Sequence, residues 1–218
     1  MPKWLPSILA LAITIGVPIA LILANVFVFM NPTWLAYQYS QPDFPPSVRF
    51  TPPDRYRLAS ESIEYIRGNR TLEQFKALGV YDEREIKHMI DVRELVDKVK
   101  IVLPIIVILI IASLVVLARE RENRALAARG LLNGAVLTIG LFVAVGFFAT
   151  IGFQTFFTLF HKVFFAGDTW LFNYTDSLIQ FYPLPFWFAT SIALVAITIG
   201  EAIIIGLIGW RLGRIAIR

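Results

Sequence analysis

The chemistry in this sequence centres on two histidines, His88 and His161, the only ones in 218 residues. Each has carboxylates nearby: Asp91 stands about one helical turn from His88, and Asp168 and Asp176 follow His161. Histidine is the side chain whose pKa best suits acid and base work near neutral pH. The pair therefore indicates proton transfer, with an aspartate available to orient an imidazole.

Each histidine also has a simpler explanation. His161 stands among phenylalanines typical of a membrane interface, where a half-exposed histidine is tolerated. His88 could be an exposed helix residue paired with Asp91. A metal site made from both histidines and one or two carboxylates is a further alternative, but no HExxH or similar spacing supports it. We rank acid–base chemistry above metal binding and predict no metal and no cofactor.

Further polar side chains follow His161. Asn173 and Tyr174 could donate hydrogen bonds to an oxyanion. The sequences GD and NYTD, however, are also ordinary turn chemistry. A bare turn would not need the apolar residues 170–172, which favour a loop that dips into lipid.

Four long apolar runs must position these residues. The chain is 57% hydrophobic with a mean hydropathy of +0.67, too apolar for an ordinary soluble domain. Each run can cross about 30 Å of hydrocarbon as a helix. A cleaved signal peptide is the alternative for the first run, but the run is longer than a usual signal and no small-x-small site follows it. We predict transmembrane helices at residues 1–30, 101–118, 131–152 and 186–210.

Arginines in the short loops set the expected orientation. The loop at residues 119–130 and the tail at residues 211–218 are rich in arginine, so the positive-inside rule places both in the cytoplasm. Residues 31–100 then form an extracytoplasmic domain, and residues 153–185 an extracytoplasmic interfacial loop. The predicted fold is mainly α, a polytopic membrane protein with four transmembrane helices and an extracytoplasmic domain between helices 1 and 2.

This topology changes the balance for the histidines, because it places both on the same outer side of a cytoplasmic membrane. The chain has no cysteine, which excludes disulfides and a thiol nucleophile. Its basic pI of about 9.5 is explained by arginines that flank the apolar runs, so we predict no nucleic-acid partner.

The extracytoplasmic segment has recognisable local signals. Residues 31–56 are rich in proline and predict an irregular loop, whereas residues 57–67 look helical and end at Gly68. Asp82 and Glu85 have the spacing of a capping box for the helix that carries His88. This helix is amphipathic, so we expect it to lie along the membrane surface or on the outer loop, with a bend near residues 98–104.

Glu201 is an isolated charge within the last apolar run. A carboxylate inside a membrane indicates function by default. Glu201 is expected near the cytoplasmic side, far from both histidines. We therefore expect its carboxylate either to form a hydrogen bond between two helices or to pair with an arginine near Arg211.

Two blocks, DEREIKHMIDVREL and FHKVFFAGDTWLF, resemble the lipoprotein intramolecular transacylase family of small four-helix bacterial membrane proteins. The resemblance implies movement of an acyl chain from the sn-2 position of a diacylglyceryl lipoprotein to the amine of its N-terminal cysteine, giving the lyso form. It also implies that His88 and His161 are the two outward-facing family histidines. Arg84, Glu85 and Asp91 match the pattern around the first of them.

The predicted site therefore has two catalytic histidines and a set of supporting or substrate-binding residues. The expected partners are a diacylated lipoprotein and membrane lipids. The supporting residues are Arg84, Glu85, Asp91, Asp168, Trp170 and Asp176.

In the expected mechanism, His161 is the base on the amine, and His88 relays the proton or stabilises the oxyanion. The reverse assignment, or a histidine nucleophile, stays open. The competing hypothesis is a non-enzymatic membrane subunit or assembly factor, which would leave the two histidines far apart.

Overall fold

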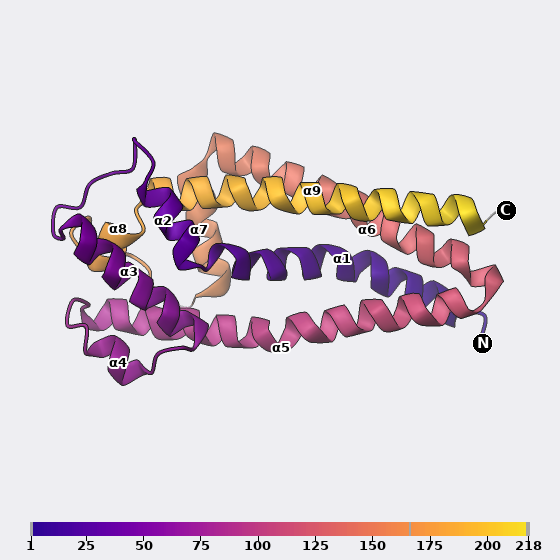
Figure 1. Cartoon of the computed structure of the whole chain (residues 1–218), viewed down its shortest axis with the longest axis horizontal. Helices are drawn as coiled ribbons and strands as arrows, with labels where there is room; N and C mark the ends of the chain where they lie inside the picture. Colours follow the sequence, from indigo (N-terminus) through magenta and orange to yellow (C-terminus); the bar gives the residue numbers. More distant parts are fainter. Residues whose placement is uncertain (1, 166, 217–218) are drawn as a thin grey trace. The chain divides into compact units, whose positions relative to one another are not determined.

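The computed structural model describes residues 2–165 and 167–216, and the regular elements of that part of the chain are helices (Figure 1). Ala166 and Arg218, which belong to the predicted interfacial loop and tail, lie outside the described residues. The helices are α1 (Leu5–Phe29), α2 (Pro32–Tyr39), α3 (Pro52–Arg67), α4 (Leu72–Lys76), α5 (Glu83–Arg119), α6 (Arg124–Ile151), α7 (Phe153–Phe164), α8 (Ser177–Phe181) and α9 (Leu184–Ala216), with a 3-10 turn η1 (Arg121–Asn123) before α6.

The chain forms two compact units. The apolar unit consists of Met1–Val26, Lys100–Phe147 and Ala193–Arg218. The histidine unit consists of Phe27–Val99 and Phe148–Ile192, and it contains both histidines.

Four helices are long and apolar enough to cross a membrane, namely α1, α5, α6 with its preceding turn, and α9. This confirms the predicted helical fold with four candidate spans. The helices extend beyond the apolar runs, because α6 begins at Arg124 and α9 continues to Ala216. Charged residues end a hydrophobic run without ending a helix, since arginine and lysine are good helix formers.

The helix that carries His88 is continuous with the second apolar run. The sequence suggested a separate surface helix with a bend near residues 98–104, but α5 runs without interruption from Glu83 to Arg119. Pro104 lies inside it. A proline removes one backbone hydrogen bond, and long apolar helices tolerate that loss because neighbouring turns and helices compensate.

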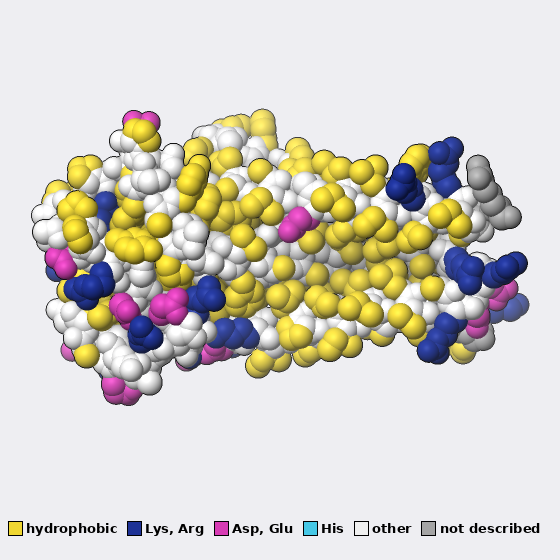
Figure 2. All heavy atoms as spheres, in the orientation of Figure 1, with side chains coloured by type: hydrophobic (Ala, Val, Ile, Leu, Met, Phe, Trp, Pro, Cys, Tyr) yellow, Lys and Arg dark blue, Asp and Glu magenta, His cyan; other side chains and the backbone are white. Residues whose placement is uncertain are grey.

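Within the apolar unit, the start of α1, the α5–α6 turn and the end of α9 lie at the same end (Figure 1). Figure 2 shows lysine and arginine side chains gathered there, while most side chains on the visible face of the unit are hydrophobic. The arginines that motivated the predicted orientation are therefore grouped in space as well as in sequence.

Glu201 forms a hydrogen bond between two helices of the apolar unit. The Asn25 Nδ2 amide on α1 donates to Glu201 Oε2 at 2.8 Å and to Thr198 Oγ1 at 3.0 Å, both on α9. Asn25 is fully buried. The expected helix–helix hydrogen bond is confirmed, and its partner is an asparagine on α1.

The proline-rich segment is more regular than the sequence suggested. Helix α2 begins at Pro32, with Asn31 as its N-cap, and α3 begins at Pro52, with Thr51 as its N-cap. Proline suits the first turn of a helix because the amide it lacks has no partner there. The predicted irregular loop is therefore confined to the residues between these helices. Helix α3 ends at Arg67 with Gly68 as its C-cap, in agreement with the predicted stop at this glycine.

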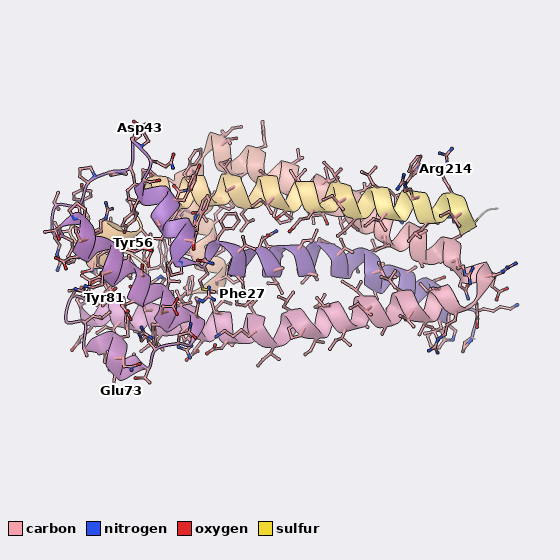
Figure 3. The ribbon with its side chains drawn as sticks, in the orientation of Figure 1. Phe27, Asp43, Tyr56, Glu73, Tyr81 and Arg214 are labelled. Carbon is pink, nitrogen blue, oxygen red and sulfur yellow. The ribbon has the colours of Figure 1, made fainter. Side chains whose placement is uncertain are left out.

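The histidine unit has its own hydrophobic core, which combines side chains of α2, α3, α4, α5, α8 and the start of α9. Buried Arg55 ties this core together, since its Nε donates to the Gln180 carbonyl at 2.6 Å and its Nη1 donates to the Pro45 carbonyl at 2.6 Å. Tyr81 and Tyr56, labelled in Figure 3, also lie in this unit.

Candidate active site

Helices α5 and α7 bring the two histidines together. The centroids of the His88 and His161 rings are 6.0 Å apart, and their planes are inclined by 28°. Each side chain is only 8% exposed. His88 is therefore not an exposed helix residue, and His161 is not half exposed at an interface. The wide separation expected of a non-enzymatic subunit is not observed.

An aromatic cage surrounds the two imidazoles. Phe165 contacts both rings, with centroids 5.0 Å from His88 and 5.6 Å from His161. Phe172 lies 5.3 Å from His88, and Trp170 lies 5.0 Å from His161. These rings replace water around the imidazoles, so the cage disfavours their charged forms.

Sequence reasoning had assigned the cage phenylalanines to lipid contact. A run of aromatics beside an apolar helix is typical of a membrane interface, and the run carries no periodic signal that separates a lipid-facing ring from a histidine-facing one. Phe165 is 8% exposed, and Phe172 is partly buried. Their place in the site emerges only from the fold of the loop after α7.

The tautomer of His161 is fixed by its own helix. His161 Nδ1 lies 2.7 Å from the carbonyl oxygen of Phe157. Because a carbonyl can only accept, Nδ1 carries the proton, and Nε2 keeps its lone pair. The sequence pointed to an aspartate for this orienting role, but a backbone carbonyl one turn earlier performs it. His161 can therefore act as a base through Nε2.

Burial also sets the ionisation of the pair. It lowers the pKa of His88 to about 4, with the neighbouring His161 as a second cause. Burial lowers the pKa of His161 as well, while the bond to the Phe157 carbonyl opposes this change. His88 lies in the charged part of α5, before the apolar stretch that begins at Ile101. Both imidazoles are thus neutral near pH 7, the state that a general base requires.

His88 has one ring nitrogen with no assigned partner. Its Nδ1 is buried and makes no hydrogen bond to the described residues. Neither a lone pair nor a proton at this nitrogen is therefore committed to another group of the described residues. Among residues 2–165 and 167–216, no three His, Cys, Asp or Glu side chains gather closely enough to hold a metal ion.

Glu85 links α5 to the helix after the loop. Its Oε1 accepts from the Leu178 amide at 2.7 Å, and its Oε2 accepts from the Asp82 amide at 2.9 Å. Asp82 Oδ1 in turn accepts from the Glu85 amide at 2.8 Å, which confirms the predicted capping box. Glu85 is 2% exposed, and this burial raises the pKa of its carboxyl group. These contacts fix the start of α5 one turn before His88.

Arg84 links the same helix to the loop itself. Its Nη2 donates to Asp176 Oδ2 at 2.7 Å, and its guanidinium lies 5.6 Å from the centre of the Phe172 ring. Asp176 Oδ2 also accepts from the Asn173 amide at 2.7 Å. Arg84 and Asp176 therefore hold in place the loop that carries Phe172 against His88.

Asp91 anchors the other part of the loop. Its Oδ2 accepts from Thr169 Oγ1 at 3.3 Å, and within the described residues it forms no bond to His88. Thr169 was not foreseen, because a single threonine between an aspartate and a tryptophan carries no spacing signal. The contact shows how α5 is joined to the turn before Trp170.

Asp168 lies in a turn, which is the alternative that the sequence GD had also suggested. It is exposed, and its backbone carbonyl accepts from the Leu171 amide at 3.1 Å. Trp170 Nε1 donates to the Gly167 carbonyl at 3.1 Å, and Gly167 has a φ of 73°, in the left-handed region that favours glycine. The turn thereby orients Trp170 toward His161.

Comparison with known proteins identifies the family. The family model described as lipoprotein intramolecular transacylase Lit matches residues 11–187, a range that contains both histidines. The chain belongs to this family. Its activity is intramolecular acyl transfer on lipoproteins, and it is an integral membrane protein.

Solved structures of the Lit transacylase from Bacillus cereus have the same fold. One is 19% identical with a TM-score of 0.74 and covers 96% of both chains. Another, a variant with a histidine replaced by alanine, is 20% identical with a TM-score of 0.75 and covers 96% of this chain and 94% of that one. An uncharacterized protein of Aquifex aeolicus is 26% identical and covers 71% of each chain.

Proposed function

We propose that this transacylase moves the sn-2 acyl chain of a diacylglyceryl lipoprotein to the amine of its N-terminal cysteine, and that His88 and His161 carry the protons. The observation that carries this proposal is the convergence of the two histidines, 6.0 Å apart, within one aromatic cage. Membership of the family supplies the reaction class. The residues around the pair supply its geometry.

The reaction moves one proton from the attacking amine to the leaving oxygen, so no proton is gained or lost overall. The amine attacks the ester carbonyl, and His161 Nε2 accepts the proton that this nitrogen loses. The tetrahedral intermediate then expels the glyceryl oxygen, which takes up a proton and becomes the free hydroxyl of the lyso product. An amide bond forms as the ester bond breaks.

His88 has the complementary task in this proposal. It relays the proton toward the leaving oxygen or donates a hydrogen bond to the oxyanion, and its unpartnered Nδ1 supports either role. The reverse assignment uses the same two rings and the same proton balance. Because the amine and the ester belong to one molecule, holding them together also contributes several kcal/mol to the rate.

The remaining predicted residues support and seat the substrate. Arg84, Glu85, Asp91 and Asp176 hold the loop after α7 and the start of α8 against α5. Trp170 forms one wall of the cage beside His161, and Asp168 belongs to the turn that orients it.

The outer face of α7 offers a seat for acyl chains. This face is apolar and exposed, with exposed fractions between 43% and 74%. It is therefore compatible with contact to lipid, and membrane lipids complete the proposed environment. Its residues are Leu159, Phe160, Val163 and Phe164.

Mass spectrometry of a lipoprotein N-terminus tests the proposal. We expect the N-acylated lyso form only in cells that carry this protein, and the diacylglyceryl form in matched cells without it. An unchanged diacylglyceryl form in both would contradict the proposed substrate. Equal amounts of the lyso form in both would assign the activity to another protein.

We further propose that both termini and residues 119–130 are cytoplasmic, and that residues 31–100 and 153–185, with both histidines, are extracytoplasmic. The chain lacks cysteine, so single cysteines report on topology directly. Glu122→Cys, at an exposed site in η1, should react with an impermeant thiol reagent only after the membrane is opened. Tyr174→Cys, 64% exposed, should react in intact cells. The reverse pattern would overturn the orientation.

A further inference from the structure

A groove runs between α6 and α9 in the apolar unit. It is an open, shallow hollow of about 410 Å³, and its lining is almost entirely apolar. Ala135 and Ala202 form its buried floor, and Val136, Ile203 and Leu207 form its exposed sides. On helices of this composition, such a groove faces hydrocarbon.

Glycines create the groove by letting the two helices approach closely. A Cβ atom at Gly209 would lie 2.9 Å from the Ala128 carbonyl oxygen and 2.9 Å from the Leu132 amide nitrogen. At Gly206 it would lie 3.2 Å from the Ala135 side chain. Small residues at such a crossing leave shallow hollows beside it, because no side chain fills them.

A second hollow of about 200 Å³ continues the groove toward the basic end of the unit. The two hollows share Leu132 and Trp210, and the second is also lined by Arg129 and Arg214. The Arg214 guanidinium, at the end of α9 in Figure 3, lies 4.8 Å from the centre of the Trp210 ring. Within the described residues, neither arginine is paired with a carboxylate.

We propose that these two hollows bind one phospholipid with an anionic headgroup. One acyl chain lies in the apolar groove, and the phosphate lies between Arg129 and Arg214. Trp210 stands at the boundary between the two, as tryptophan does at membrane interfaces. Basic pockets between membrane helices suit anionic headgroups, and unpaired guanidiniums provide the charge that such a group requires.

The observations favour a lipid over other occupants. A free phosphate would leave the apolar groove empty, and a peptide would bring backbone groups that the groove cannot satisfy. This lipid is not the substrate of the transacylase, because its site lies entirely within the apolar unit while both histidines belong to the other unit. Binding of this lipid does not depend on the proposed acyl shift.

Native mass spectrometry of the purified full chain tests the site. We expect dioleoyl phosphatidylglycerol to remain bound in preference to dioleoyl phosphatidylcholine. The double variant Arg129→Gln/Arg214→Gln should bind phosphatidylglycerol about 10- to 30-fold more weakly, since each arginine near a membrane surface is worth about fivefold in affinity. The control Arg119→Gln/Arg121→Gln removes the same charge outside the hollow and should keep the affinity.

Two further comparisons test the groove and the source of the phosphate. Dihexanoyl phosphatidylglycerol should bind much more weakly than the dioleoyl lipid, and inorganic phosphate should not displace the latter. The proposal is overturned if the control variant loses as much affinity as the hollow variant, or if phosphatidylcholine binds equally. It is also overturned if the short-chain lipid binds as well, or if phosphate alone competes.

Discussion

Replacing either His88 or His161 with glutamine is expected to slow the acyl shift by about 10²-fold or more, the typical contribution of a positioned proton carrier. Glutamine keeps a polar side chain of similar length but cannot exchange a proton near neutral pH. Alanine is less suitable, because each histidine is 8% exposed and its removal would leave a cavity.

The effects of the two substitutions on the rate should not be additive. If the histidines act as one proton-transfer unit, the double variant should be hardly slower than either single variant. The lyso product is measured by mass spectrometry at matched protein levels. Lys87→Gln and Lys162→Gln are matched controls, because each changes an exposed neighbour of one histidine on the same helix. They should retain activity close to that of the unchanged protein.

Different outcomes separate the possible roles. Near-normal product from one histidine variant would remove that histidine from the mechanism, and near-normal product from both would end the acid–base proposal. Full multiplication of the two losses would mean that the histidines serve independent steps.

Acidification is expected to destabilise the folded protein through His88. In the unfolded chain this imidazole takes up a proton near pH 6.5, whereas burial lowers its folded pKa to about 4. The unfolded state therefore binds the proton first as pH falls. The stability from the neutral buried ring is complete above pH 6.5 and decreases between about pH 6.5 and 4, by about 3 kcal/mol in total.

The free energy of unfolding in detergent, measured from pH 7.5 to 4.5, checks this expectation. His88→Gln removes the titrating group, so its stability should fall less over the same range than that of the unchanged chain. Lys87→Gln should follow the unchanged chain. Parallel curves for all three proteins would show that His88 does not titrate with a lowered pKa.

The membrane spans and the helix cap before His88 could be predicted from the sequence. The four spans follow from long apolar runs, and the capping box of Asp82 and Glu85 follows from residue types at fixed spacing. Two roles were expected for Glu201, a helix–helix hydrogen bond or an arginine partner, and the structure has the first; its partner Asn25 is distant in sequence and could not be named. The proline content predicted an irregular loop, and this prediction was wrong where prolines occupy the first turns of helices, at Pro32 and Pro52.

The candidate site was only partly predictable. Both histidines could be singled out because they are the only two in the sequence and are predicted on the same side of the membrane. Their proximity, however, depends on how α7 packs on α5. The aspartates were expected to orient the rings, whereas the structure uses Asp91 and Asp176 to fix the loop. Sequence patterns identify acidic neighbours but not which atom each carboxylate will accept from, since that depends on the loop's backbone.

The bond between His161 and the Phe157 carbonyl has an entropic consequence. Both residues belong to α7, so the ring loses its rotational freedom when this helix forms. Ordering a side chain commonly costs about 0.5–1.5 kcal/mol at the moment of binding, and this ring has already been ordered. In the proposed reaction, the flexible partner is then the substrate, whose glyceryl arm would bring ester and amine to an imidazole whose orientation is already fixed.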